Sequence, residues 1–179
     1  MEEELLEYLC TAPCLALVGS GPSAECGLPT WRSLAEQILK QVSALSLPDK
    51  ETDPIEQAFG RDNYPLVFER IARSKAKGLG RDFLYRACKE LLSSPRANGR
   101  TYEAIVHLPF RAYFTTNLDD LLAAYLERAK TAPIRLKNTP DDLAKVDVDE
   151  LSGYVIKLHG DFEGNAHLVL TESQYDDVC

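Results

Sequence analysis

The sequence predicts an α/β fold in which a parallel sheet is flanked by helices and a helical insertion separates the first two strands. An apolar run at 14–18 leads directly into a glycine-rich turn. The next convincing strand, Arg111–Thr115, arrives only after 48–110, where no clean strand pattern occurs. Apolar runs that alternate with helical patterns are typical of parallel sheets, because their strands are buried on both faces.

The first half of the chain predicts one strand followed by helices. After the strand at 14–18 comes the small-residue stretch 19–24, and a helix is expected near Pro29, because proline favours a first helical turn. Its apolar positions recur at helical spacing: Trp31, Leu34, Ile38, Val42 and Leu45. Further helices are expected at 64–72, at 83–92 and at 100–107. We therefore expect a helical insertion at about 46–108.

The second half predicts more strands and helices in alternation. A helix should open at 117–120, directly after the strand at 111–115, and weaker strands are expected at 134–136, 154–158 and 168–170. Thr171-Glu172-Ser173-Gln174 resembles a capping box, which begins a helix. Only about eight residues remain there, fewer than a stable helix needs. We therefore expect the domain to continue past Cys179, so that its last strands are missing from this chain.

Composition restricts the classes of function. The 179 residues carry a net charge of −8, which argues against a broad basic surface for nucleic acid. No apolar run approaches the ~20 residues of a membrane helix, and the acidic start Met1–Glu4 is not that of a secretory signal. The five cysteines include no CxxC pair, which disfavours a zinc knuckle or a disulfide framework. We expect a single cytoplasmic domain, 1–179, without a metal.

The turn after the first strand has the pattern of a dinucleotide-binding loop, Gly19-x-Gly21-x-x-Ala24. Glycines allow a tight turn and let the backbone approach a pyrophosphate, which the N-terminus of the next helix then faces. An ordinary strand-to-helix turn explains the same residues. Position 41 is Gln41 in mid-helix, so the acidic residue of a dehydrogenase is lacking, and the phosphate-lysine motif GxxxxGK[ST] is absent.

Two later turns carry polar residues where strands end. Asn117 and Asp119 follow the strand at 111–115, and either present an amide and a carboxylate to a ligand or cap the next helix. His159 follows the strand at 154–158 and is either a general base or a histidine hydrogen-bonded inside a turn. No histidine pair has metal-ligand spacing.

The turns taken together are more specific than any one of them. Val18-Gly-Ser-Gly-Pro-Ser23, Gly27-Leu-Pro-Thr-Trp31, Phe114-Thr-Thr-Asn-Leu-Asp119 and Lys157-Leu-His-Gly-Asp161 occur in this order. The series, from about 12 to 176, resembles the sirtuin-like family, and specifically its bacterial branch of NAD-consuming domains. The resemblance implies a Rossmann-like sheet and cleavage of the nicotinamide–ribose bond of NAD, which is a substrate here.

The resemblance also implies roles for individual residues. Asn117 matches the catalytic asparagine that holds the nicotinamide ribose, and His159 matches the catalytic histidine. Asp119 matches the aspartate that contacts the carboxamide. The other residues expected to bind NAD are Gly19, Ser20, Gly21 and Ser23 in the phosphate loop and Thr116 in the asparagine turn. The turns that carry Gly21, Asn117 and His159 should then line one cleft.

Departures from the family pattern favour the NAD+ hydrolase branch over the protein deacylases. Deacylases carry Gln where this chain has Thr116, Asp-Phe-Arg where it has 30–32, and a zinc module that it lacks. The hydrolase branch is often fused to other domains and serves in defence against phage, so a fused C-terminal domain and a homo-oligomer are expected partners. A deacylase, a non-catalytic NAD or ADP-ribose sensor and a pure interaction module remain alternatives.

Overall fold

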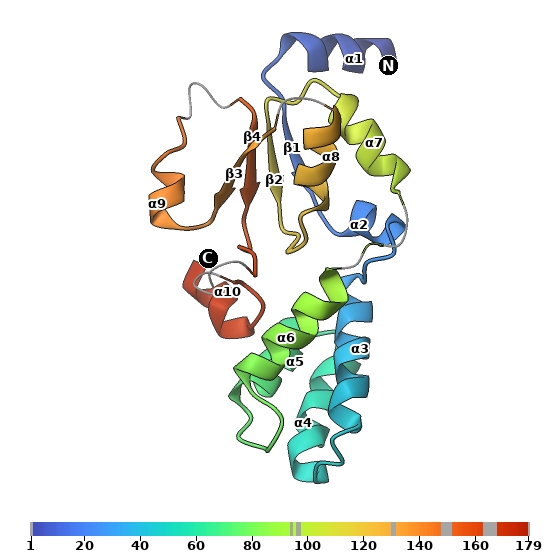
Figure 1. Cartoon of the computed structure of the whole chain (residues 1–179), viewed down its shortest axis with the longest axis vertical. Helices are drawn as coiled ribbons and strands as arrows, with labels where there is room; N and C mark the ends of the chain where they lie inside the picture. The colour runs from blue at the N-terminus through green and yellow to red at the C-terminus, as the bar shows by residue number, and fades with distance from the viewer. Residues whose placement is uncertain are drawn as a thin grey trace. The chain divides into compact units, whose positions relative to one another are not determined.

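The computed structural model of this chain describes residues 2–93, 95, 98–129, 132–147, 152–162 and 168–178 (Figure 1). The chain divides into two compact units. One comprises 1–27 and 96–167 and contains the sheet, and the other comprises 28–95 and 168–179 and is helical. Cys179 lies outside the described residues.

The sheet consists of four parallel strands in the order β1-β2-β4-β3. Their bounds are β1 (Leu15–Val18), β2 (Ala112–Thr115), β3 (Ile134–Lys137) and β4 (Tyr154–Lys157). The last residues of all four strands lie in register, Val18 beside Thr115, Thr115 beside Lys157, and Lys157 beside Lys137. The α/β fold and these four strands are confirmed. Because every strand runs the same way, the turns that follow them start at one edge of the sheet.

Two helices cover one face of this sheet, as Figure 1 shows for α7 (Arg100–His107) and α8 (Leu121–Ala129). Ala16, Tyr113 and Val155 form a row across the strands on this face. They belong to a buried cluster to which Tyr102 and Val106 of α7 and Leu122, Tyr125 and Leu126 of α8 also contribute. The sheet unit also contains α1 (Glu2–Thr11), α2 (Gly21–Glu25) and α9 (Pro140–Leu143).

The opposite face is covered unevenly. Ile156 is 2% exposed, whereas Leu15 and Leu17 on β1 are 47% and 72% exposed. Within the described sheet β1 is an edge strand. A parallel sheet is ordinarily buried on both faces. Leu15 and Leu17 of β1 are therefore exposed at positions that are usually buried in this class of fold.

The helical unit contains α3 (Trp31–Ser43), α4 (Asp49–Gly60), α5 (Tyr64–Arg73), α6 (Arg81–Leu92) and α10 (Glu172–Val178). Helix α5 packs against α3, α4, α6 and α10. The helices expected near Pro29, at 64–72, at 83–92 and at 100–107 are confirmed, and several helices do separate β1 from β2. Helix α4, which contains Pro54, was not predicted. No helix in the described part of the chain is long and apolar enough to cross a bilayer.

The strand expected at 168–170 is wrong. These residues are buried but form no strand. The amides of Leu170 and Thr171 each donate to Oε1 of Gln174 at 3.0 Å, so a side chain takes the place of a neighbouring strand. The hydrogen bond from the Thr171 amide to the Gln174 side chain is the one that defines a capping box. The helix predicted there, α10, is confirmed.

Candidate functional site

The three polar turns begin side by side at the carboxyl edge of the sheet. The Thr115 hydroxyl at the end of β2 donates to the Val18 carbonyl at the end of β1, at 2.8 Å. The Thr115 carbonyl accepts from the amide of Leu158, just after β4, also at 2.8 Å. Ligands of open α/β sheets bind beyond this edge. Thr115 therefore joins the starts of the turns that carry Gly19, Asn117 and His159.

The side-chain amide of Asn117 connects the second turn to the first. Its Nδ2 atom donates to the Gly19 carbonyl at 2.9 Å and lies 3.1 Å from Oγ of Ser23. The same nitrogen lies 3.2 Å from the phenol oxygen of Tyr102 on α7. The Asn117 backbone amide donates to Oγ1 of Thr115 at 3.0 Å. Asn117 is 6% exposed and is held from its backbone and its side chain.

Ser23 lies at the centre of the same network. Its hydroxyl donates to Oδ2 of Asp119 at 2.9 Å and lies 2.7 Å from the Tyr102 phenol oxygen. Ser23 is 1% exposed. The structure thus brings Ser23, Asn117 and Asp119 together, and it places the serine hydroxyl in a buried contact with protein groups.

Asp119 takes one of the two roles weighed from the sequence, the capping of the next helix. Its Oδ1 accepts from the Leu121 amide at 3.0 Å, so it caps α8. Burial raises the pKa of Asp119 above its usual value, although the bonds from Leu121 and Ser23 favour the carboxylate. A carboxylate has about four acceptor positions, and these two bonds leave others for a ligand. The predicted contact with a carboxamide stays a prediction.

The glycine loop presents open backbone. Gly19 and Gly21 are exposed, and a Cβ atom added at either would meet no atom within 4 Å. Ser20 between them is half-buried, and its side chain makes no capping hydrogen bond. The helix that follows, α2, has only five residues. The loop leaves space for a ligand beside its backbone, and a phosphate contact at Gly19, Ser20 and Gly21 stays a prediction.

His159 lies against the asparagine turn. The imidazole is half-buried, and this burial lowers the pKa of His159 below its usual value. A hydrogen bond to the backbone of Thr116, the residue before Asn117, partly offsets that effect. Gly160, with φ 69°, allows the chain to turn directly after the histidine. The imidazole is thus next to the asparagine turn, and its neutral form is favoured.

Two residues near these turns were not singled out from the sequence. Lys157, at the end of β4, is 4% exposed, and its ammonium donates to the Leu118 carbonyl at 2.9 Å and to Oδ1 of Asp120 at 2.8 Å. A lysine within the strand Tyr154–Leu158 was the available signal, because a buried ammonium needs partners. Tyr102 gave no such signal, since a tyrosine on the apolar face of a helix reads as core.

Residues 111–179 match the SIR2-like domain. That segment runs from the start of β2 to α10 and includes the turns of Asn117 and His159. The SIR2-like match implies an activity that involves NAD and specifies neither a hydrolase nor a deacylase. A comparison with curated proteins finds no match.

The asparagine turn, inside the matched segment, contacts the glycine loop, which lies outside it. Gly19 and Ser23 precede the matched residues, yet both lie within hydrogen-bonding distance of Asn117.

Among the described residues no group of three or more His, Cys, Asp or Glu is arranged to hold a metal ion, and a metal-free site stays a prediction.

Proposed function

We propose that this protein is an NAD+ hydrolase that cleaves the bond between nicotinamide and ribose. The observation that carries the proposal is the meeting of three turns at one sheet edge. The Asn117 amide bonds to Gly19, and His159 lies against the backbone of Thr116. The SIR2-like match over 111–179 supports NAD as the substrate class.

The chemistry asks little acid catalysis of the protein. Nicotinamide in NAD+ is a cationic leaving group, so it departs without being protonated, and the transition state has oxocarbenium character, as in other glycoside cleavages. The protein must orient the ribose and activate a nucleophile. In this proposal Asn117 holds the ribose and Asp119 contacts the carboxamide. Thr116 and the loop residues Gly19, Ser20, Gly21 and Ser23 contribute further contacts with NAD.

His159 is the proposed base. It would take a proton from a ribose hydroxyl or from the attacking water, which requires a neutral imidazole. Burial lowers the pKa of His159, so the neutral form predominates at pH 7. This environment supports a base and disfavours a role as a fixed positive charge.

The deciding experiment measures nicotinamide release from NAD+ by the full-length protein. We expect wild type to release nicotinamide and both Asn117→Ala and His159→Ala to lose at least about a hundredfold in kcat, the range of a general base. His107→Ala is the matched control, because His107 is exposed at the end of α7, and it should retain wild-type turnover. Unchanged turnover in both site variants would refute the assignment.

Parallel assays separate the alternatives. Release of nicotinamide that requires an acylated peptide would identify a deacylase, and calorimetric binding of NAD without release would identify a sensor. The resemblance is also our basis for proposing that the cleavage serves defence against phage. Plaque counts on cells that carry wild type or Asn117→Ala test that role, and we expect protection with wild type alone.

A further inference from the structure

We propose that Tyr102 is a positioning residue for Asn117, which it holds with the amide oxygen turned toward the substrate. This inference rests on the proposed function and adds a residue to it. Tyr102 lies on α7, outside all three polar turns, and is 0% exposed, so it acts through its neighbours and does not touch NAD.

The hydrogen bonds of Asn117 fix which atom of its amide faces which way. The Gly19 carbonyl is only an acceptor, so the atom of Asn117 that lies 2.9 Å from it must be the NH₂ nitrogen. That nitrogen has two hydrogens and three acceptors within 3.2 Å, on Gly19, Ser23 and Tyr102. No donor among the described residues bonds to Oδ1. The oxygen is therefore the atom left to accept from a ribose hydroxyl or a water.

The carboxylate of Asp119 sets the direction of the remaining hydrogens. Ionised Asp119 can only accept hydrogen bonds, so the single hydrogen of the Ser23 hydroxyl is directed at Oδ2. The Ser23 oxygen must then accept in its 2.7 Å contact with Tyr102, which makes the phenol the donor. The phenol oxygen in turn keeps its acceptor capacity for Nδ2 of Asn117. Tyr102 thereby fits between the serine and the asparagine as donor to one and acceptor from the other.

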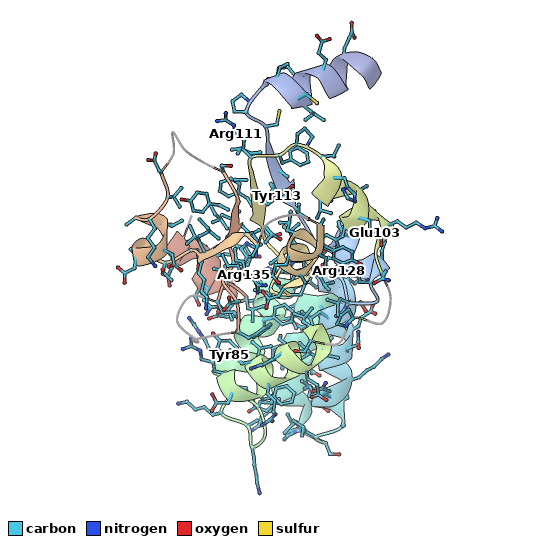
Figure 2. The ribbon with its side chains drawn as sticks, turned by 45° about the horizontal axis from the view of Figure 1, so that its top comes forward. Tyr85, Glu103, Arg111, Tyr113, Arg128 and Arg135 are labelled. Atoms are coloured by element: carbon cyan, nitrogen blue, oxygen red, sulfur yellow. The ribbon has the colours of Figure 1, made fainter. Side chains whose placement is uncertain are left out.

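The ring of Tyr102 is held firmly enough to position another group. It stacks on Tyr125 of α8 with ring centroids 5.2 Å apart and planes inclined by 22°. The Tyr125 hydroxyl accepts from the Gly99 amide at 2.7 Å, at the start of α7. The guanidinium of Arg128, labelled in Figure 2, lies 5.4 Å from the centroid of the Tyr125 ring. These contacts leave the phenol little freedom to turn away from Asn117.

The test compares Tyr102→Phe with Tyr113→Phe. Tyr113, labelled in Figure 2, lies on β2 and is 3% exposed. Its buried hydroxyl has no hydrogen-bond partner among the described residues. Tyr113→Phe therefore removes a buried phenol oxygen, as Tyr102→Phe does, but breaks no hydrogen bond. In the nicotinamide-release assay we expect Tyr102→Phe to lower kcat about tenfold with little change in KM, and Tyr113→Phe to match wild type. A purely structural loss would lower the amount of folded enzyme and leave kcat per folded molecule unchanged.

A second measurement reads the hydrogen bond without any turnover. In protein labelled with ¹⁵N-asparagine, the side-chain NH₂ signal of Asn117 is assigned by its disappearance in Asn117→Asp. We expect this NH₂ group to exchange with solvent faster in Tyr102→Phe than in wild type and Tyr113→Phe. Equal exchange in the two phenylalanine variants, or an unchanged kcat in Tyr102→Phe, would overturn the inference alone. Absence of nicotinamide release by wild type would instead overturn the proposed function, and the exchange measurement would still decide whether Tyr102 holds the amide.

Discussion

The ammonium nitrogen of Lys157 lies 2.9 Å from the carbonyl oxygen of Leu118, directly between Asn117 and Asp119 in the chain. The second partner of this buried lysine is the carboxylate of Asp120, which is 52% exposed. The last residue of β4 is thus bonded to the turn that follows β2. A buried charge is tolerated only when it is paired and hydrogen-bonded, and both partners of Lys157 come from this one turn.

Replacement of Lys157 by methionine should destabilise the protein. Lys157→Met keeps much of the apolar stem but leaves the Leu118 carbonyl without its donor, so we expect the free energy of unfolding to fall by about 1–3 kcal/mol. Urea unfolding measures this change. Lys145→Met is the control, because Lys145 bonds to Asp142 on the surface with 63% of its side chain exposed, and it should change stability little. Equal effects of the two substitutions would contradict the role of Lys157.

His159 should make stability depend on pH. Burial lowers its folded-state pKa, whereas the unfolded chain titrates near its ordinary value of about 6.5. Below that value the unfolded state binds more protons than the folded state, so stability falls as the pH drops and is fully present above it. Urea midpoints between pH 7.5 and 5 measure the trend, and His159→Asn should flatten it. The His107→Asn control should keep the wild-type slope, and a wild-type slope in His159→Asn would count against the buried imidazole.

A methyl group at residue 99 should disturb the start of α7. A Cβ atom added to Gly99 would lie 2.8 Å from Sγ of Cys26 and 3.3 Å from the Pro22 carbonyl oxygen. We expect Gly99→Ala to lower the free energy of unfolding by about 1–3 kcal/mol, as overpacking does. Cys26→Ala removes the closest atom, so the double variant should lose less than the sum of the two single variants. Unfolding of all four proteins measures this coupling, and strict additivity would contradict the clash.

Apolar patterning was enough to predict most of the sheet. The predicted runs at 14–18, 111–115 and 154–158 each contain a strand that buries at least one face in the core, and such strands differ plainly from turns and amphipathic helices. The same pattern failed at 168–170, because burial alone does not tell a strand from an apolar segment whose amides bond to Gln174. Helix α4 escaped prediction because Pro54 lies inside it, where proline normally argues against a helix.

The candidate site was predictable only in part, because some of its polar residues belong to recognisable turns and Tyr102 does not. Asn117 and His159 stood out from the sequence, since each directly follows a strand and belongs to a turn typical of ligand sites. The contact of Tyr102 with Ser23 and Asn117 joins residues 79 and 15 positions apart. No local pattern encodes such a pairing, and it emerges only from the way α7 packs beside α2 and α8.

The location of α7 limits how far the region between β1 and β2 can be shortened. An engineer who joined the two strands through a brief linker would retain both of them but discard the phenol that braces the asparagine side chain. Trimming that stops before Gly99 would spare the phenol, its stacking partner and the amide that anchors that partner. The last part of this connection therefore supports the asparagine turn from behind, and only α3 to α6 are candidates for deletion.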